Sequence, residues 1–110
     1  MRTLAMLLVL ALAASAPAAA GEVFGKITAD GNPVGEGTTV AGKCAARSYP
    51  AVPTDKSGSY HIVLDETGKC ALTVTHKGQS AEVGIVSYDD AVQVDLVLEV
   101  RDGKLTARRK

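Results

Sequence analysis

Short runs in which apolar and polar residues alternate make up most of the chain after residue 20. Clusters of Gly, Asp, Asn and Pro separate these runs about every eight to twelve residues. Alternation with a period of two is typical of strands that bury one face, and this spacing of turns is typical of a sandwich or barrel. No helical period appears in these runs. The pattern therefore predicts an all-β domain.

We expect about seven strands arranged as a Greek-key-type β-sandwich, each strand with one apolar face. The expected strands are residues 22–29, 38–44, 59–64, 70–76, 80–86, 92–100 and 104–107. Tyr60 supplies a large ring for the core, and the longest strand, 92–100, turns its even-numbered residues through Val100 inward. Asp102-Gly103 is typical of a two-residue hairpin between the last two strands. The stretch 45–53 contains two prolines, so we expect a loop or an edge there.

The first 20 residues have a different pattern. A basic residue, Arg2, precedes an apolar stretch over residues 4–14, and Pro17 is followed by three alanines that end at Ala20. This order is typical of a secretory signal peptide. The apolar stretch is too short to span a bilayer comfortably, so cleavage after Ala20 would leave a domain of residues 21–110 without a membrane span. We expect this domain in the periplasm or outside the cell.

The charge balance narrows the choice of partners. The formal net charge of the chain at pH 7 is zero, which gives no general attraction to nucleic acid. The basic cluster at residues 108–110 is interpreted as a solvated tail, with contact to anionic envelope polymers as the alternative. No calcium-loop motif is present and no cofactor is expected.

Two cysteines, Cys44 and Cys70, remain after the predicted leader. In an oxidising compartment such a pair normally forms a disulfide. Free thiols and a metal site are the alternatives. However, two cysteines cannot fill a tetrahedral zinc site, and the spacing of His61 and His76 fits no zinc motif. We therefore expect a disulfide and no metal. Both cysteines fall on the apolar side of their strands, which places the bridge in the core.

Three sequence pieces follow one another between residues 25 and 74. They are Asp30-Gly31-Asn32-Pro33-Val34, then Thr54-Asp55-x-x-Gly58-x-Tyr60, then the strand sequence over residues 68–74. Together they resemble the carboxypeptidase regulatory-like domain, which is a transthyretin-like β-sandwich. The resemblance implies an accessory or binding module of the kind attached to enzymes or outer-membrane proteins. The chain departs from that family at Cys70, where an aromatic residue is common.

Catalysis has little support in the sequence. Some transthyretin-like proteins hydrolyse a purine-derived ring with His and Arg residues and a C-terminal Tyr-Arg-Gly-Ser motif, whereas this chain ends Thr-Ala-Arg-Arg-Lys. His61 and His76 are interpreted as solvated surface residues, and the chain has no nucleophile elbow. The expectation is a domain that is not an enzyme.

The stretch 45–53 carries the candidate binding residues Arg47, Tyr49 and Pro50, and Tyr88 lies in a later loop. Arg and Tyr are favoured in protein interfaces, and prolines reduce the ordering cost of binding. We therefore expect a module that binds a protein or an envelope component. The alternative is that residues 45–53 have no binding role and only connect two strands. A weak carbohydrate-binding module using exposed aromatic residues is the second functional reading, and exposed strand edges would allow a homodimer.

Overall fold

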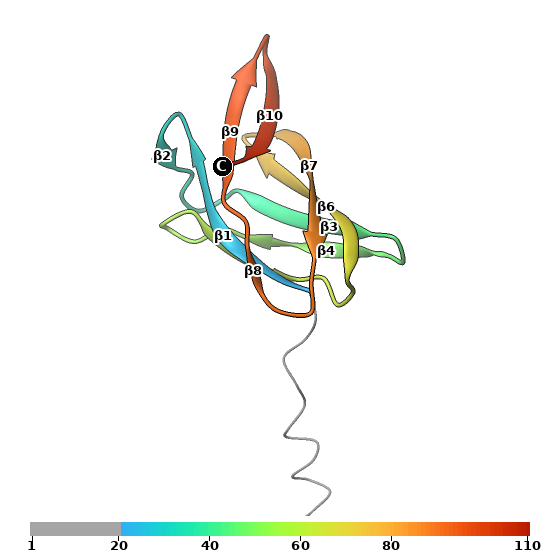
Figure 1. Cartoon of the computed structure of the whole chain (residues 1–110). Helices are drawn as coiled ribbons and strands as arrows, with labels where there is room; N and C mark the ends of the chain where they lie inside the picture. Colours follow the sequence, from blue (N-terminus) through green and yellow to red (C-terminus); the bar gives the residue numbers. More distant parts are fainter. Residues whose placement is uncertain (1–20) are drawn as a thin grey trace, which may run out of the picture.

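Two β-sheets pack face to face in the computed structural model, which describes residues 21–110 (Figure 1). The expected all-β sandwich is confirmed. The predicted signal peptide, residues 1–20, lies outside the described residues. Within residues 21–110 there is no helix long and apolar enough to cross a membrane. The strands are β1 (Glu22–Ala29), β2 (Asn32–Pro33), β3 (Thr39–Cys44), β4 (Ser48–Pro53), β5 (Ser59–Val63), β6 (Gly68–His76), β7 (Gln79–Ser87), β8 (Val92–Gln93), β9 (Leu96–Arg101) and β10 (Lys104–Arg109).

One sheet has the order β4-β3-β6-β7 and is antiparallel throughout. The other is built around β1, which pairs in parallel with β8 and β9 on one side and antiparallel with β5 and β2 on the other. The β10 strand extends this sheet beyond β9. Each sheet turns one apolar face toward the other, so the core lies between them.

The prediction of seven strands is too low, because two short features and one edge strand escape the alternation pattern. The β2 strand has only two residues and closes a turn onto β1. The β4 strand occupies most of the stretch expected to be a loop or an edge. It pairs only with β3, so its prolines can sit on the free edge, where a missing N–H donor costs nothing.

The expected single strand over residues 92–100 is broken at Val94 and Asp95. There the Tyr60 hydroxyl donates to the Val94 carbonyl at 2.6 Å, and the Asp95 carboxylate accepts the Lys26 N–H at 2.9 Å. One backbone bond to β1 remains at the break, from the Val94 N–H to the Phe24 carbonyl at 2.7 Å, and the side chains of Tyr60 and Asp95 bond the neighbouring backbone groups. Gly25 permits this close approach, since a Cβ at that position would overlap the Val94 carbonyl.

The core consists of the inward-facing aliphatic residues of both sheets together with Tyr60. Tyr60 is 4% exposed, as its position on the apolar face predicts. The pattern fails at Val100, which was expected inside but is 62% exposed. Val100 keeps the orientation of the buried Leu98 two residues earlier. The β9–β10 hairpin, however, projects past the rest of the sandwich, so nothing covers it there (Figure 1).

Three hairpins end in two-residue turns whose residues both have positive φ: Asp30-Gly31, Lys77-Gly78 and Asp102-Gly103. Positive φ at both positions matches the right-handed twist of the flanking strands. The hairpin expected at Asp102-Gly103 is therefore confirmed. The backbone conformation of these turns sets the pairing registers of their hairpins.

Candidate functional site

The predicted disulfide is present and joins Cys44 of β3 to Cys70 of β6, with an S–S distance of 2.06 Å. The two residues are directly opposite each other in the antiparallel ladder, and their Cα atoms are 4.2 Å apart. Cys70 belongs to the core, and Cys44 is half-buried beside it. The bridge lies on the core side of one sheet, as expected, and fixes the β3–β6 pair where the chain turns into β4.

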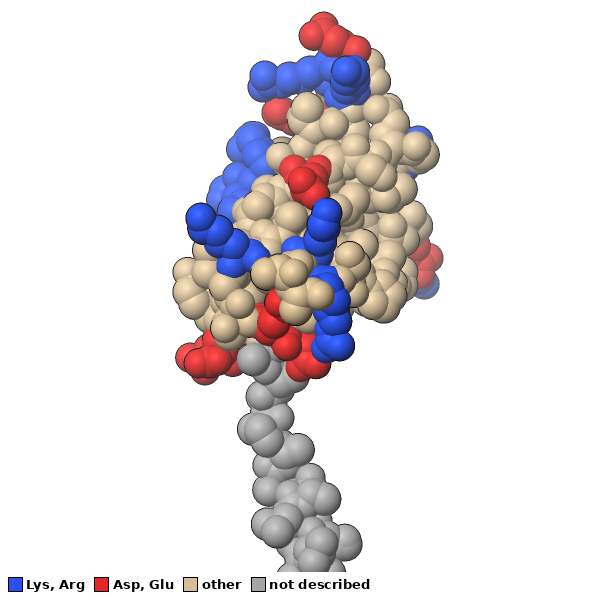
Figure 2. All heavy atoms as spheres, turned by 90° about the vertical axis from the view of Figure 1, so that its right-hand side faces the viewer, with Lys and Arg blue, Asp and Glu red and all other residues tan. Residues whose placement is uncertain are grey.

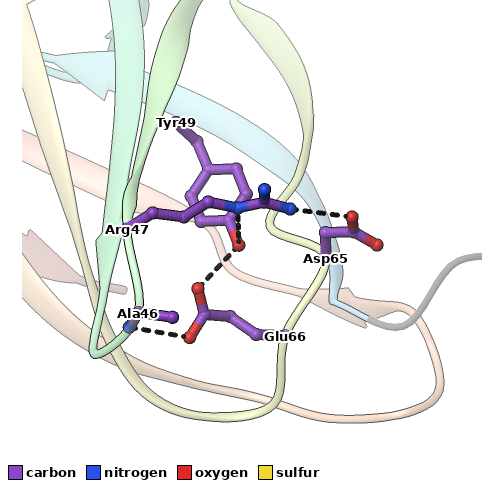
Figure 3. Close-up of polar contacts among 5 residues, drawn as sticks. All are labelled: Ala46, Arg47, Tyr49, Asp65 and Glu66. Atoms are coloured by element: carbon purple, nitrogen blue, oxygen red, sulfur yellow. Dashed lines mark hydrogen bonds and ion pairs between the residues drawn. The ribbon is translucent and has the colours of Figure 1, made fainter.

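Four polar contacts lie beside this disulfide, and three of them connect the segment at the β3–β4 turn to the β5–β6 turn (Figure 3). The Tyr49 hydroxyl donates to Glu66 Oε2 at 2.6 Å, and Glu66 Oε1 accepts the Ala46 N–H at 3.1 Å. Arg47 donates through Nε to the Tyr49 oxygen at 3.2 Å and through Nη2 to Asp65 Oδ2 at 3.0 Å. We call these five residues and the disulfide the stapled end.

The electrostatics of the stapled end centre on the short bond between Tyr49 and Glu66. The hydrogen bond from Tyr49 holds the pKa of Glu66 below its ordinary value. Burial of the Tyr49 ring, followed by its bond to Glu66, raises the pKa of the Tyr49 hydroxyl. Both shifts favour the pair as it stands, with an ionised carboxylate and a neutral phenol.

Arg47 is more exposed than Tyr49, the residue that it contacts. Its guanidinium lies 5.2 Å from the centroid of the Tyr49 ring, within the range of a cation–π contact. Its ion pair with Asp65 is exposed, with side-chain accessibilities of 60% and 58%. An exposed pair of this kind adds little stability. Arg47 therefore presents a charge to solvent from a turn that other bonds keep in place.

Tyr88 and Pro50 complete the predicted site residues, and the structure brings neither into the polar network. Pro50 is exposed on β4. Tyr88 is 55% exposed, and its carbonyl accepts the N–H of Gly21 at 2.9 Å. Gly21 also accepts the Leu64 N–H at 2.9 Å. Tyr88 is thus anchored near the β5–β6 turn by its backbone. Within residues 21–110 its side chain makes no hydrogen bond to Arg47 or Tyr49.

The aromatic residues considered for carbohydrate binding do not form one platform. Phe24, which is 39% exposed, lies on β1 of one sheet, and the half-buried Tyr49 lies on β4 of the other. The structure therefore gives the carbohydrate reading no shared stacking surface from these two rings.

Sequence reasoning missed a groove of about 360 Å³ between the sheets, at the end where β6 turns into β7. Its walls come from the Asp30-Gly31 turn, the Lys77-Gly78 turn and the β9–β10 hairpin. The three two-residue turns can be recognised in the sequence and indicate three hairpins. The groove between these hairpins, however, depends on how far each hairpin projects from the sandwich, which the local sequence does not encode.

Charge and metal-ligand patterns single out neither end of the molecule. On the face drawn in Figure 2, Lys and Arg side chains are interspersed with Asp and Glu. In the described part of the chain, no three His, Cys, Asp or Glu side chains gather in a way that could hold a metal ion. His61 lies 3.2 Å from Glu22 on one sheet, whereas His76 bonds Thr38 at 2.7 Å on the other. The two histidines are therefore not partners in one site.

No family model and no curated protein matches this chain in sequence. Among solved structures, the chain is similar to 5-hydroxyisourate hydrolase of Klebsiella pneumoniae, with a TM-score of 0.58 and 16% sequence identity. The match covers 82% of this chain and 93% of the hydrolase. At this identity the likeness concerns the fold, which is that of a transthyretin-like β-sandwich.

This comparison contradicts the expectation that the domain is not an enzyme. The sandwich that implied an accessory module is also the framework of a hydrolase. The expectation, which was drawn from the missing C-terminal motif, the missing nucleophile elbow and the histidines interpreted as solvated, is therefore corrected, because one fold carries unrelated functions.

Proposed function

We propose that residues 21–110 form an exported binding domain that recognises a protein or envelope component through the stapled end. The observation that carries the proposal is the Tyr49–Glu66 bond of 2.6 Å, which locks the turn bearing Arg47 beside the disulfide. A surface held in one conformation loses little entropy when a partner binds. The stapled end thus combines a rigid turn with the exposed charge of Arg47, whose ion-pair partner can be exchanged.

Arg47 is the residue we expect to make the main contact. Its present partner, Asp65, is as exposed as Arg47 itself, so a carboxylate on a bound protein can replace it at little cost. Tyr49 acts here as the support of Arg47 rather than as a free aromatic contact, because its hydroxyl is already bonded to Glu66. Pro50 and Tyr88 are also exposed, and we include them as candidate contacts of the same partner.

The setting of the proposal is an oxidising compartment, with which the disulfide agrees. We place the protein in the periplasm or outside the cell, after removal of residues 1–20. The finer resemblance to carboxypeptidase regulatory-like domains supports the same role, since those domains are accessory or binding modules. A carbohydrate ligand remains the second candidate only through the exposed ring of Tyr88.

The test compares two exposed arginines, each paired with one acid, at different ends of the domain. Arg101 is exposed and pairs with Glu99 at 3.3 Å, which makes Arg101→Glu a matched control for Arg47→Glu. Oxidised protein, produced from its full sequence, would be used to capture partners from envelope extract. Each captured partner would then be purified and its affinity measured directly. We expect Arg47→Glu to weaken binding at least about tenfold and Arg101→Glu to leave it unchanged.

Equal affinity for the two variants would overturn the proposal. Sedimentation with purified cell-wall polymer separates the carbohydrate reading. Binding to polymer that is lost in Tyr88→Ala and kept in Arg47→Glu would favour the carbohydrate candidate over the protein candidate.

A further inference from the structure

The end of the sandwich away from the disulfide contains an open groove between the sheets. Its volume of about 360 Å³ falls within the range of small-molecule sites. The β1–β2 turn forms one side, the β6–β7 turn the other, and the β9–β10 hairpin the back. None of the residues of the stapled end lines it, so its function is independent of the one proposed above.

The floor of the groove is apolar and incompletely covered. Leu98 and Leu105 are buried there, at 1% and 8% exposure. Val100 lines the same groove and shares the inward orientation of Leu98, yet it is 62% exposed. An inward-facing aliphatic side chain without a protein neighbour over it leaves room for an apolar group from a ligand.

Hydrogen bonds hold the walls of the groove in place. The Gln79 side-chain oxygen accepts the Leu105 N–H at 3.0 Å, which ties the β6–β7 turn to the β9–β10 hairpin. Nδ1 of His76 lies 2.7 Å from the hydroxyl oxygen of Thr38, a residue only 1% exposed. The groove is therefore formed before any ligand arrives.

The mouth of the groove carries two charges of opposite sign, one from each sheet. Asp30 and Lys77 each occupy the first position of a two-residue turn, and both are exposed. In the part of the chain that the structure describes, neither forms an ion pair. Glu99, the other acid at the groove, lies 3.3 Å from Arg101 and 3.8 Å from Arg108. One carboxylate and one ammonium thus remain available above an apolar floor.

From this arrangement we infer that the groove binds a small zwitterion with an aliphatic side group, namely a free hydrophobic amino acid or dipeptide. The ligand's ammonium would face Asp30, its carboxylate would face Lys77, and its side chain would cover Val100. Each part of the ligand would thus contact one of the three groups described above: the carboxylate of Asp30, the ammonium of Lys77 or the side chain of Val100. Charge complementarity fixes the orientation, and the apolar floor selects the side chain.

The experiment is a titration of the isotopically labelled, oxidised protein with Leu-Leu, followed by amide chemical shifts. We expect saturable shifts around Asp30, Lys77 and Val100. Acetylating the amino group of the dipeptide, or converting its carboxylate to an amide, is expected to weaken binding about tenfold in each case. Asp30→Asn should weaken Leu-Leu similarly while leaving the acetylated peptide unaffected. Lys77→Gln should behave in the same way toward the amidated peptide.

Two controls match these variants. Asp102→Asn changes an aspartate with the same turn position and a positive φ of 51°, outside the groove lining, and Lys43→Gln removes an exposed lysine from β3. Both controls should bind Leu-Leu as the unmodified protein does. Absence of saturable shifts up to about 10 mM peptide, or equal binding of blocked and free peptides, would overturn the inference. So would concentration-dependent shifts at the groove without peptide, because a second copy of the chain would then occupy it.

Discussion

At the stapled end the turn side chains bond to one another, whereas at the groove end they face solvent. Glu66 bonds the side chain of Tyr49 and the backbone of Ala46 across two turns. Asp30 and Lys77 each occupy a two-residue turn at the groove, but in the described residues neither side chain forms an ion pair. Both ends close the same two sheets, so the difference is not required by the fold.

The contrast reflects two ways of making a turn. Two-residue turns with positive φ are specified by backbone conformation, so their side chains are free for other purposes. The β3–β4 and β5–β6 turns lack that geometry and use a disulfide and side-chain bonds instead. A sandwich end held by side chains becomes a fixed surface. The groove end also has side-chain bonds, from Gln79 to Leu105 and between His76 and Thr38, but the side chains of its turn residues Asp30 and Lys77 take no part in them.

The largest expected effect comes from removing the disulfide. Cys44 and Cys70 are separated by 26 positions in the sequence, and a loop of this length predicts a stabilisation of about 3.5 kcal/mol. The double variant Cys44→Ser/Cys70→Ser should therefore melt on the order of 15 °C lower by circular dichroism. Amide shifts at the groove should change little. An unchanged melt, in the variant or in reductant, would show that the stapled end does not depend on its bridge.

A smaller effect is expected from Tyr49→Phe, which removes the bond to Glu66. We expect the melting temperature at neutral pH to fall by roughly 5 °C. Because the folded state lowers the pKa of Glu66, the ionised carboxylate stabilises the fold above its ordinary pKa of 4.5. That contribution is lost as the pH falls through the lowered value. The gap between the melting temperatures of the two proteins should therefore narrow as the pH falls below 4.5.

Melts of both proteins across this pH range provide the check. Glu66→Gln serves as a control, since it removes the same titration while keeping an acceptor for Tyr49. A gap between Tyr49→Phe and the unmodified protein that is constant with pH would contradict the role given to the Tyr49–Glu66 bond.

The smallest effect is expected from a substitution at Val100, for which Leu98 serves as a buried reference. Val100→Ser should change the free energy of unfolding by less than about 0.5 kcal/mol, because the side chain is already 62% exposed. Leu98→Ala, two residues earlier on the same strand and 1% exposed, should lose about 2–5 kcal/mol. Urea unfolding of both variants measures the difference. A large loss in Val100→Ser would mean that the groove is closed in solution.

The local sequence was sufficient to predict those features of the fold that depend on a single strand or a single turn. Alternation placed Tyr60 in the core, and Asp102-Gly103 marked its hairpin. The break at Val94 and Asp95 could not be foreseen, since it depends on bonds to residues 34 and 69 positions away along the chain. The groove was missed for a related reason. Val100 has a core pattern, but its exposure depends on where the opposite sheet ends.

The candidate site was predicted in part. Arg47 and Tyr49 were recognised as one cluster and do lie together. Their acidic partners, Asp65 and Glu66, were seen only as turn residues, because nothing in their own segment indicates a partner 17 or 18 positions earlier. Such contacts follow from the sheet order, which becomes known only with the fold.

Gly21 makes the first described residue an integral part of the folded domain. It is buried, its φ is +82°, and a Cβ there would lie only 2.9 Å from the Glu66 carbonyl oxygen, so a side chain at this position would be strained. Its N–H donates to the Tyr88 carbonyl and its own carbonyl accepts the Leu64 N–H, so one residue joins the segment after β7 to the segment after β5. A substitution at Gly21 would therefore loosen two chain segments at once.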